Sequence, residues 1–170
     1  ILLGSTGQGK TTLLAFLAGQ AMRHSDLRVY FFDRHRGVEV FCRAIQGAYV
    51  NFDGDKDSTS MNPFSCKDVP ENRAFLRRWL KAITMVDDAV SEKEIARAVT
   101  TAFDYLRPEE RTLKNLHKSC FSPTGAMRRE LFRWVNDQQY GLIFNSPNDT
   151  LDLTAHFIAF DFTHIFEDEI

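Results

Sequence analysis

The sequence predicts an α/β fold in which a largely helical segment interrupts a small sheet. Runs of apolar, aromatic and β-branched residues at 27–33, 48–52 and 156–162 are typical of buried strands. Between the last two runs, residues 68–139 place apolar side chains at helical spacing. A glycine-rich loop and a helical run open the chain, and this order of elements is typical of α/β proteins.

The composition is that of one soluble globular domain. The chain has 170 residues, of which 44% are hydrophobic and 26% charged. Its net charge of -2 gives no overall basic field of the kind that marks nucleic-acid binders. Cys42, Cys66 and Cys120 match no zinc or redox spacing and suggest a reducing cytoplasm. The apolar stretches are all far shorter than the roughly 20 residues that cross a bilayer.

The chain starts without Met, and Ile1-Leu2-Leu3 directly precede the glycine-rich loop. A loop of this kind normally follows a buried strand, of which three residues supply only the end. We therefore expect the chain to be a segment of a longer protein whose first strand begins upstream.

The stretch GSTGQGKT at residues 4–11, called the phosphate loop below, matches the pattern G-x-x-x-x-G-K-[ST]. Gly4 and Gly9 let the backbone turn tightly and approach a ligand closely. Lys10 places a positive charge against the β- and γ-phosphates of a nucleotide, and the hydroxyl of Thr11 completes the shell of a bound magnesium ion. The pattern therefore predicts ATP and Mg²⁺ as cofactors, with Lys10 and Thr11 as the catalytic residues and Thr11 as the metal ligand.

The remaining residues of the phosphate loop are expected to bind the nucleotide mainly through backbone N–H groups. They are Ser5, Thr6, Gly7 and Gln8. Successive N–H groups form an anion-binding concavity, and the positive end of the helix that begins near Lys10 strengthens it. Thr12 either reaches the α-phosphate or fills the first turn of that helix.

The first block, residues 1–67, alternates helices and strands. A helix over 10–23 has Leu13, Leu14, Leu17 and Ala21 at helical spacing. The strand at 27–33 ends at Asp33, a short helix follows over 38–45, and a second strand spans 48–52. Because ligands bind at the carboxyl ends of strands in open α/β sheets, we expect the phosphate loop and Asp33 at the same edge.

The second block, residues 68–139, is predicted to form a helical insertion subdomain. Pro70, between Asp68 and Glu71, marks the start of a helix, and Ser91 and Glu94 form a capping-box pattern at another. The predicted apolar faces consist of Phe75, Trp79 and Ile83 in the first helix and of Ile95, Val99, Ala102, Phe103 and Leu106 in the second. Pro108 ends the second helix, and two shorter helices are expected over 112–118 and 125–135.

The third block, residues 140–170, returns to strand character and completes the sheet domain begun by residues 1–67. Strands are predicted at 140–144 and 156–162, with a turn over 145–150 between them.

Several stretches beyond the phosphate loop resemble the CagE/TrbE/VirB family of type IV secretion ATPases. They are YFFDRHRGVEVFCRAIQGAYV (30–50), MNPF (61–64), PENRAFLRRWL (70–80), EIARAV (94–99), YGLIF (140–144) and LDLTAHFIAFDFTHI (151–165). They occur in order over nearly the whole chain, which makes the resemblance much more specific than the phosphate loop alone. One departure is Asn145, which stands where the family commonly has an acidic residue.

The resemblance implies a RecA-like P-loop NTPase sheet with a mainly helical insertion. Family members act at the cytoplasmic face of the bacterial inner membrane, where they power pilus assembly and transfer of protein or DNA. The implied partners are other type IV secretion components and further copies of the same chain, in a hexamer or a dimer. DNA remains a possible partner.

The resemblance also implies that the second acidic motif, which supports magnesium and activates water, lies beyond the final residue. The strand 156–162 imitates that motif because it ends near Asp161, but Phe162 and not Glu stands directly after this residue. We interpret Asp161 as a strand-end carboxylate bonded to nearby backbone or to His164. We therefore expect the chain alone to bind nucleotide weakly and not to hydrolyse ATP.

Asp33 and the arginines of the insertion leave alternatives open. Asp33 orders a water or a magnesium ligand, or it forms a turn salt bridge with Arg34 or Arg36, and the base rate for such charges favours the salt bridge. Basic residues of the insertion are more often solvated helix surface than a nucleic-acid site. They are Arg73, Arg77, Arg78, Arg128, Arg129 and Arg133.

Two other classes of function stay open at this point. A DNA-translocating coupling ATPase of the FtsK/VirD type shares the phosphate loop and the sheet, and it would show DNA-stimulated hydrolysis. A nucleotide-binding module without turnover would use the same loop only to control subunit assembly. The near-neutral charge and the stretch PENRAFLRRWL favour the secretion ATPase.

Overall fold

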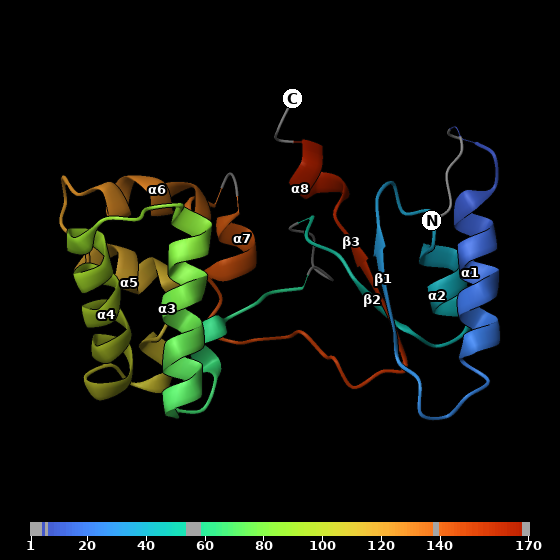
Figure 1. Cartoon of the computed structure of the whole chain (residues 1–170), viewed down its shortest axis with the longest axis horizontal. Coiled ribbons are helices and arrows are strands. Elements are labelled where there is room, and N and C mark those ends of the chain that lie inside the picture. Colours follow the sequence, from blue (N-terminus) through green and yellow to red (C-terminus); the bar gives the residue numbers. More distant parts are fainter. Residues whose placement is uncertain (1–4, 6, 54–58, 138–139, 168–170) are drawn as a thin grey trace. The chain divides into compact units, whose positions relative to one another are not determined.

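The computed structural model describes residues 5, 7–53, 59–137 and 140–167, and it divides into two compact units (Figure 1). Unit 1 comprises residues 1–59 and 151–170, and unit 2 comprises residues 60–150. The predicted α/β class is confirmed, because unit 1 contains a parallel sheet with helices and unit 2 is helical in its described part. Within the described ranges, no helix is both long and apolar enough to cross a membrane.

The sheet of unit 1 has three parallel strands in the order β1-β3-β2. They are β1 (Val29–Asp33), β2 (Ala48–Val50) and β3 (Phe157–Asp161). The central strand β3 is buried along nearly its whole length, whereas β1 alternates between half-buried and exposed positions, as an edge strand does. Val29 pairs with Phe157 and Asp33 with Asp161, so β1 and β3 end side by side.

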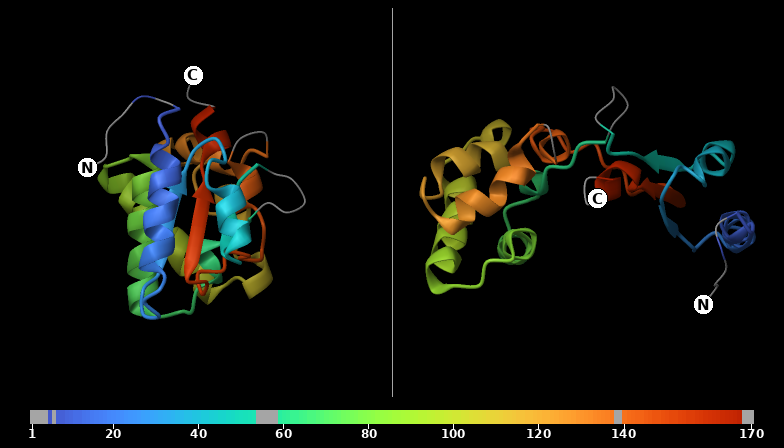
Figure 2. Two further views of the ribbon diagram at one scale, coloured as in Figure 1. Left: turned by 90° about the vertical axis from the view of Figure 1, so that its right-hand side faces the viewer. Right: turned by 90° about the horizontal axis from the view of Figure 1, so that it is seen from above.

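Helices α1 (Lys10–Ala21) and α2 (Glu39–Ala44) lie on the same face of this sheet (Figures 1 and 2). Between them and the sheet is a small core of Ala15, Val38, Cys42, Phe157 and Ala159. A short helix α8 (Thr163–Glu167) follows β3.

The core-facing side of α1 differs from the prediction. The predicted side has Leu13 and Leu17, which are 44% and 52% exposed, whereas Ala15 is buried against the sheet. The reason is that apolar residues surround this helix on all sides, so periodicity does not select a face. The small side chain of Ala15 lets the helix pack closely.

The opposite face of the sheet has a row of stacked aromatic rings. Phe32 lies over Phe160 and Phe162, with ring centroids 5.3 Å and 5.9 Å apart, and Phe52 stacks on Phe162 at 5.8 Å. Offset stacking of this kind stabilises aromatic pairs beyond the burial of their area.

Unit 2 consists of helices packed around their own apolar core. In chain order they are η1 (Pro63–Ser65), α3 (Pro70–Thr84), α4 (Ala89–Asp104), η2 (Pro108–Glu110), α5 (Leu113–Ser119), α6 (Ala126–Val135) and α7 (Gly141–Phe144). The helices predicted at 112–118 and 125–135 and the helix start at Pro70 are confirmed. The buried face of α3 consists of Leu76, Leu80 and Thr84, while Phe75 is 48% exposed.

The start of α4 lies earlier than predicted. Asp88, not Ser91, caps this helix, because its carboxylate accepts hydrogen bonds from the backbone N–H groups of Val90 and Ser91 at 3.0 Å each. The Ser91 hydroxyl also donates to Asp88, at 2.6 Å. Glu94 instead accepts a bond from the backbone of Ser122 at 3.3 Å.

The strand predicted at 140–144 is wrong, because residues Gly141–Phe144 form the one-turn helix α7. Gly141 packs so closely on Asn136 that an added Cβ would lie 2.5 Å from its carbonyl oxygen. The backbone N–H of Asn145 donates to the carbonyl of Gly141 at 2.9 Å and so closes the helical turn. The side-chain amide of Asn145 donates to the carbonyl of Val135, also at 2.9 Å. A short apolar run is compatible with strand or buried helix, and these local contacts select the helix.

Residues 60–67 and 140–150 belong to unit 2, whereas the sequence placed them with the sheet. The backbone N–H of Met61 donates to the carbonyl of Ile143 at 2.8 Å, and the backbone N–H of Thr150 donates to the carbonyl of Ser60 at 2.9 Å. Asn62 is only 1% exposed. Its side-chain amide accepts a hydrogen bond from the backbone N–H of Phe64 at 3.1 Å and donates one to the carbonyl of Pro147 at 2.9 Å. The two ends of unit 2 are therefore fastened to each other.

We predict that Asn62→Ala lowers the free energy of unfolding of unit 2 by about 2 kcal/mol, because it leaves two backbone groups without their partner. Chemical denaturation of the full-length protein measures this. Asn72→Ala is the matched control, since Asn72 makes one exposed bond, at 2.8 Å to Lys67. Equal losses in the two variants would contradict this role of Asn62.

Candidate nucleotide-binding site

The phosphate loop turns into α1 through two glycines in the left-handed region of backbone space. Gly7 has φ 83° and Gly9, the residue before α1, has φ 75°. An added Cβ at either position would meet nothing within 4 Å. Glycine is therefore needed here for its backbone conformation and not to relieve crowding in the free loop.

A cavity of about 360 Å³ lies over this turn, lined by Gly7, Gly9, Lys10, Thr11 and Thr12. The Lys10 ammonium folds back over the loop and donates to the backbone carbonyl of Ser5 at 2.5 Å. Lys10 and Thr11 are half-buried, whereas Thr12 is exposed. The 12-residue helix α1 directs its first N–H groups at this cavity.

The structure describes two of the four other residues predicted to bind the nucleotide. Ser5 and Gln8 are exposed beside the cavity, while Gly4 and Thr6 lie outside the described residues. The structure thus brings Gly7, Gly9, Lys10, Thr11 and Thr12 together at one small cavity.

Asp33 lies close to this cavity, at the carboxyl end of β1. Its carboxylate accepts a hydrogen bond from the backbone N–H of Val38 at 2.8 Å. A Cβ built on Gly37 would lie 3.2 Å from the Thr11 methyl and 3.5 Å from Asp33 Oδ1. The phosphate loop and the end of β1 therefore meet at Gly37, on the edge where the sequence predicted them.

Arg36, one of the two salt-bridge partners predicted for Asp33 besides Arg34, pairs with two other carboxylates. Its guanidinium lies 2.8 Å from Asp53 and 3.6 Å from Asp161. Asp161 is 3% exposed and also accepts bonds from the backbone N–H and the hydroxyl of Thr163, at 3.1 Å and 2.5 Å. It is thus a buried carboxylate whose partners are structural.

Tyr49 adds a buried hydroxyl to the surroundings of Asp161. Its pKa is raised, because burial disfavours the phenolate and the Asp161 carboxylate repels it. Sequence reasoning missed both Tyr49 and the bridging role of Arg36. The contact between Arg36 and Asp161 spans 125 positions, and only the parallel pairing of β1 with β3 brings them together.

These residues fit a magnesium nucleotide bound through its phosphates. The two left-handed glycines expose backbone N–H groups, Lys10 supplies a cation, and Thr11 supplies a hydroxyl at the start of the helix. Among the described residues, no cluster of three or more His, Cys, Asp or Glu side chains could hold a metal ion by itself. A cation here would depend on Thr11, the phosphates and water.

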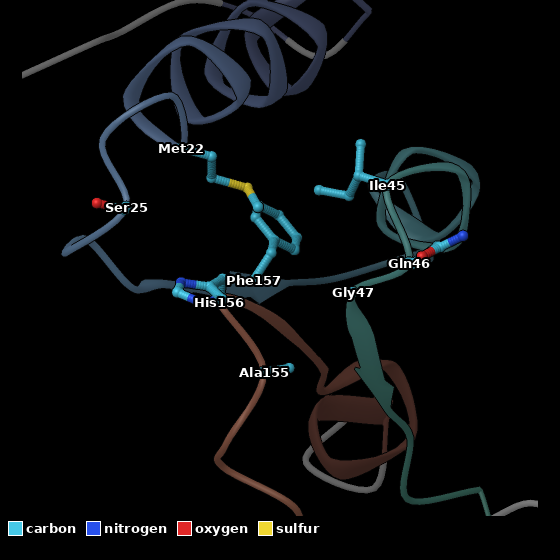
Figure 3. Close-up of a pocket in the computed structure, with 8 residues that line it drawn as sticks. All are labelled: Met22, Ser25, Ile45, Gln46, Gly47, Ala155, His156 and Phe157. Carbon is cyan, nitrogen blue, oxygen red and sulfur yellow. The ribbon is translucent and has the colours of Figure 1, made fainter.

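A second cavity, of about 490 Å³, lies near the start of β3, at the opposite end of that strand from Asp161. Figure 3 shows Met22 and Ile45 pointing toward the ring of Phe157 at its apolar floor. None of the predicted site residues line it.

The fold is an α/β fold with a glycine-rich turn at the start of its first helix, and comparison with known proteins gives the relatives of the chain. The chain is 33% identical over 173 residues to the type IV secretion system protein VirB4 of Bartonella henselae and 31% identical over 171 residues to PtlC of Bordetella pertussis. The alignments cover 98% and 90% of this chain, but only 22% and 20% of those proteins. The chain is therefore a homologue of VirB4 and PtlC, and the resemblance to type IV secretion ATPases is confirmed.

A solved structure shows the same fold. VirB4 of Thermoanaerobacter pseudethanolicus superposes with a TM-score of 0.70 at 16% identity, covering 98% of this chain and 50% of that one. No protein-family model matches the chain.

We predict that Asp161→Ala destabilises unit 1 by about 2–3 kcal/mol, because Arg36 and Thr163 lose a buried charged acceptor. Asp152→Ala is the matched control. Asp152 makes the same pair of bonds to the residue two positions later, Thr154, at 2.8 Å and 2.6 Å, but it is exposed. Denaturation curves that show equal losses would contradict a structural role that depends on burial.

Proposed function

We propose that this chain is the nucleotide-binding segment of a type IV secretion ATPase, with ATP and Mg²⁺ bound at the phosphate loop. The observation that supports this most directly is the junction of left-handed Gly7 and Gly9 with Lys10 and Thr11 at the start of α1. The homology to VirB4 and PtlC supports assigning this junction to a secretion protein.

In the proposed complex, the backbone N–H groups of Gly7, Gln8 and Gly9 and of the first turn of α1 would bind the phosphates. Lys10 exchanges its bond to the Ser5 carbonyl for the β- and γ-phosphates, and its charge stabilises the negative charge that develops during transfer. The hydroxyl of Thr11 would hold the magnesium ion, which would supply positive charge to neutralise the phosphates. Thr12 lines the same cavity.

We assign Asp161 a supporting role and not that of the magnesium-holding acid. One oxygen of its carboxylate accepts two bonds from Thr163 and the other faces Arg36, so both are occupied by protein groups. As the family resemblance implies, we propose that the acid that activates water comes from outside residues 1–170.

In the whole protein, the proposed role of ATP turnover is to power pilus assembly and substrate transfer. The proposed partners are other secretion components and further copies of the chain, at the cytoplasmic face of the inner membrane. Because the chain corresponds to about a fifth of the length of VirB4 and PtlC, these roles depend on regions that the alignment does not include.

We predict that Lys10→Ala in the full-length protein reduces ATP hydrolysis at least about a hundredfold, because it removes the cation that stabilises the transferred phosphate. Its thermal unfolding midpoint should not change, since the Lys10 side chain makes one exposed bond and no core contact. Asp161→Asn, assayed at a temperature where it remains folded, should reduce hydrolysis far less. Near-normal hydrolysis by Lys10→Ala would refute the proposed function, and equal losses in both variants would refute the role given to Asp161.

A further inference from the structure

We propose that Gly37 is a positioning residue that sets the orientation of the Thr11 side chain, and so the position of the hydroxyl that meets magnesium. This inference rests on the proposed function. It concerns a residue outside the phosphate loop, 26 positions after Thr11 in the sequence.

The contact between the two residues is close. A Cβ built on Gly37 would lie 3.2 Å from the Thr11 methyl carbon, which is tighter than nine in ten contacts that real Cβ atoms make. The methyl of Thr11 therefore faces a main chain that has no side chain. Because the methyl and hydroxyl groups of Thr occupy different staggered positions on one carbon, fixing the methyl also fixes the hydroxyl.

Space, and not backbone conformation, is what requires glycine at this position. Among the described glycines, only Gly7 and Gly9 have positive φ, and both have open space where a Cβ would lie. At Gly37 the φ angle is not positive, and a Cβ would be crowded. It is also exposed, so a demand of core packing does not explain it.

The β1–α2 loop, defined as residues 34–38, is held too firmly to move away from an added methyl group. The backbone N–H of Val38 donates to Asp33, and the backbone N–H of His35 donates to the Thr163 hydroxyl at 2.7 Å. The side chain of Arg36 binds Asp53 and Asp161. These bonds join the loop to residues at or just beyond the carboxyl ends of all three strands.

Two consecutive residues of this loop have an unfavourable backbone conformation. His35 has φ 68° and Arg36 has φ 55°, in the left-handed region that residues with a Cβ rarely adopt. Such outliers persist where the surrounding structure imposes them, and they are enriched at functional sites. Here they place Gly37 against Thr11, so an alanine at position 37 would displace the Thr11 side chain and not the loop.

The test measures binding of fluorescent ADP to the full-length protein, once with Mg²⁺ and once with EDTA. We expect Gly37→Ala to weaken binding about tenfold with Mg²⁺, in the range seen when a group that orients a metal ligand is changed, and to leave binding in EDTA unchanged. In the double variant Thr11→Ser/Gly37→Ala the clashing methyl is absent but the hydroxyl remains. Its affinity with Mg²⁺ should equal that of Thr11→Ser alone.

Gly19→Ala is the matched control, because an added Cβ there also lies 3.2 Å from a neighbour, the ring of Phe41, but does not touch Thr11. It should leave both affinities unchanged. A normal affinity of Gly37→Ala with Mg²⁺, an equal loss with and without Mg²⁺, or a double variant weaker than Thr11→Ser would each overturn the inference. If the unmodified protein binds no nucleotide, the proposed function itself fails.

Discussion

The parallel pairing of β3 between β1 and β2 is the constraint on which the site depends. It aligns Asp33 with Asp161, and it brings the segments that follow the three strands to one edge. Arg36 can then reach both Asp161 and Asp53, although these residues come from different parts of the chain. Without β3 in the centre, the β1–α2 loop would lose its bonds to Asp161 and Thr163, and Gly37 would have no fixed position beside Thr11.

The site therefore combines a local part with a long-range part. The phosphate loop is local, because left-handed glycines and a helix N-terminus form an anion cradle wherever they follow each other in sequence. Its support is long-range, because a buried carboxylate 125 positions away fixes Arg36. In the proposed nucleotide complex, this division explains how residues remote from the phosphates influence the hydroxyl of Thr11.

The sequence predicted most of the local features and few of the long-range ones. Three of the four predicted strands and the start of α3 at Pro70 followed from composition and turn chemistry. The core face of α1 could not be predicted, because its apolar residues surround the helix and only contact with the sheet selects Ala15. The helix α7 was mistaken for a strand, since the close packing of Gly141 on Asn136 is not visible in the sequence. The role of Arg36 required the strand order.

Hydrogen–deuterium exchange of the full-length protein tests most directly whether the phosphate loop and the β1–α2 loop act as one nucleotide site. The measurement compares the free protein with the protein bound to ADP, with Mg²⁺ and with EDTA. The account predicts that ADP with Mg²⁺ slows exchange in residues 7–12 and in residues 34–38 over the same range of concentration, and that ADP in EDTA slows exchange mainly in residues 7–12. Unchanged exchange in residues 7–12 at saturating ADP would contradict the account.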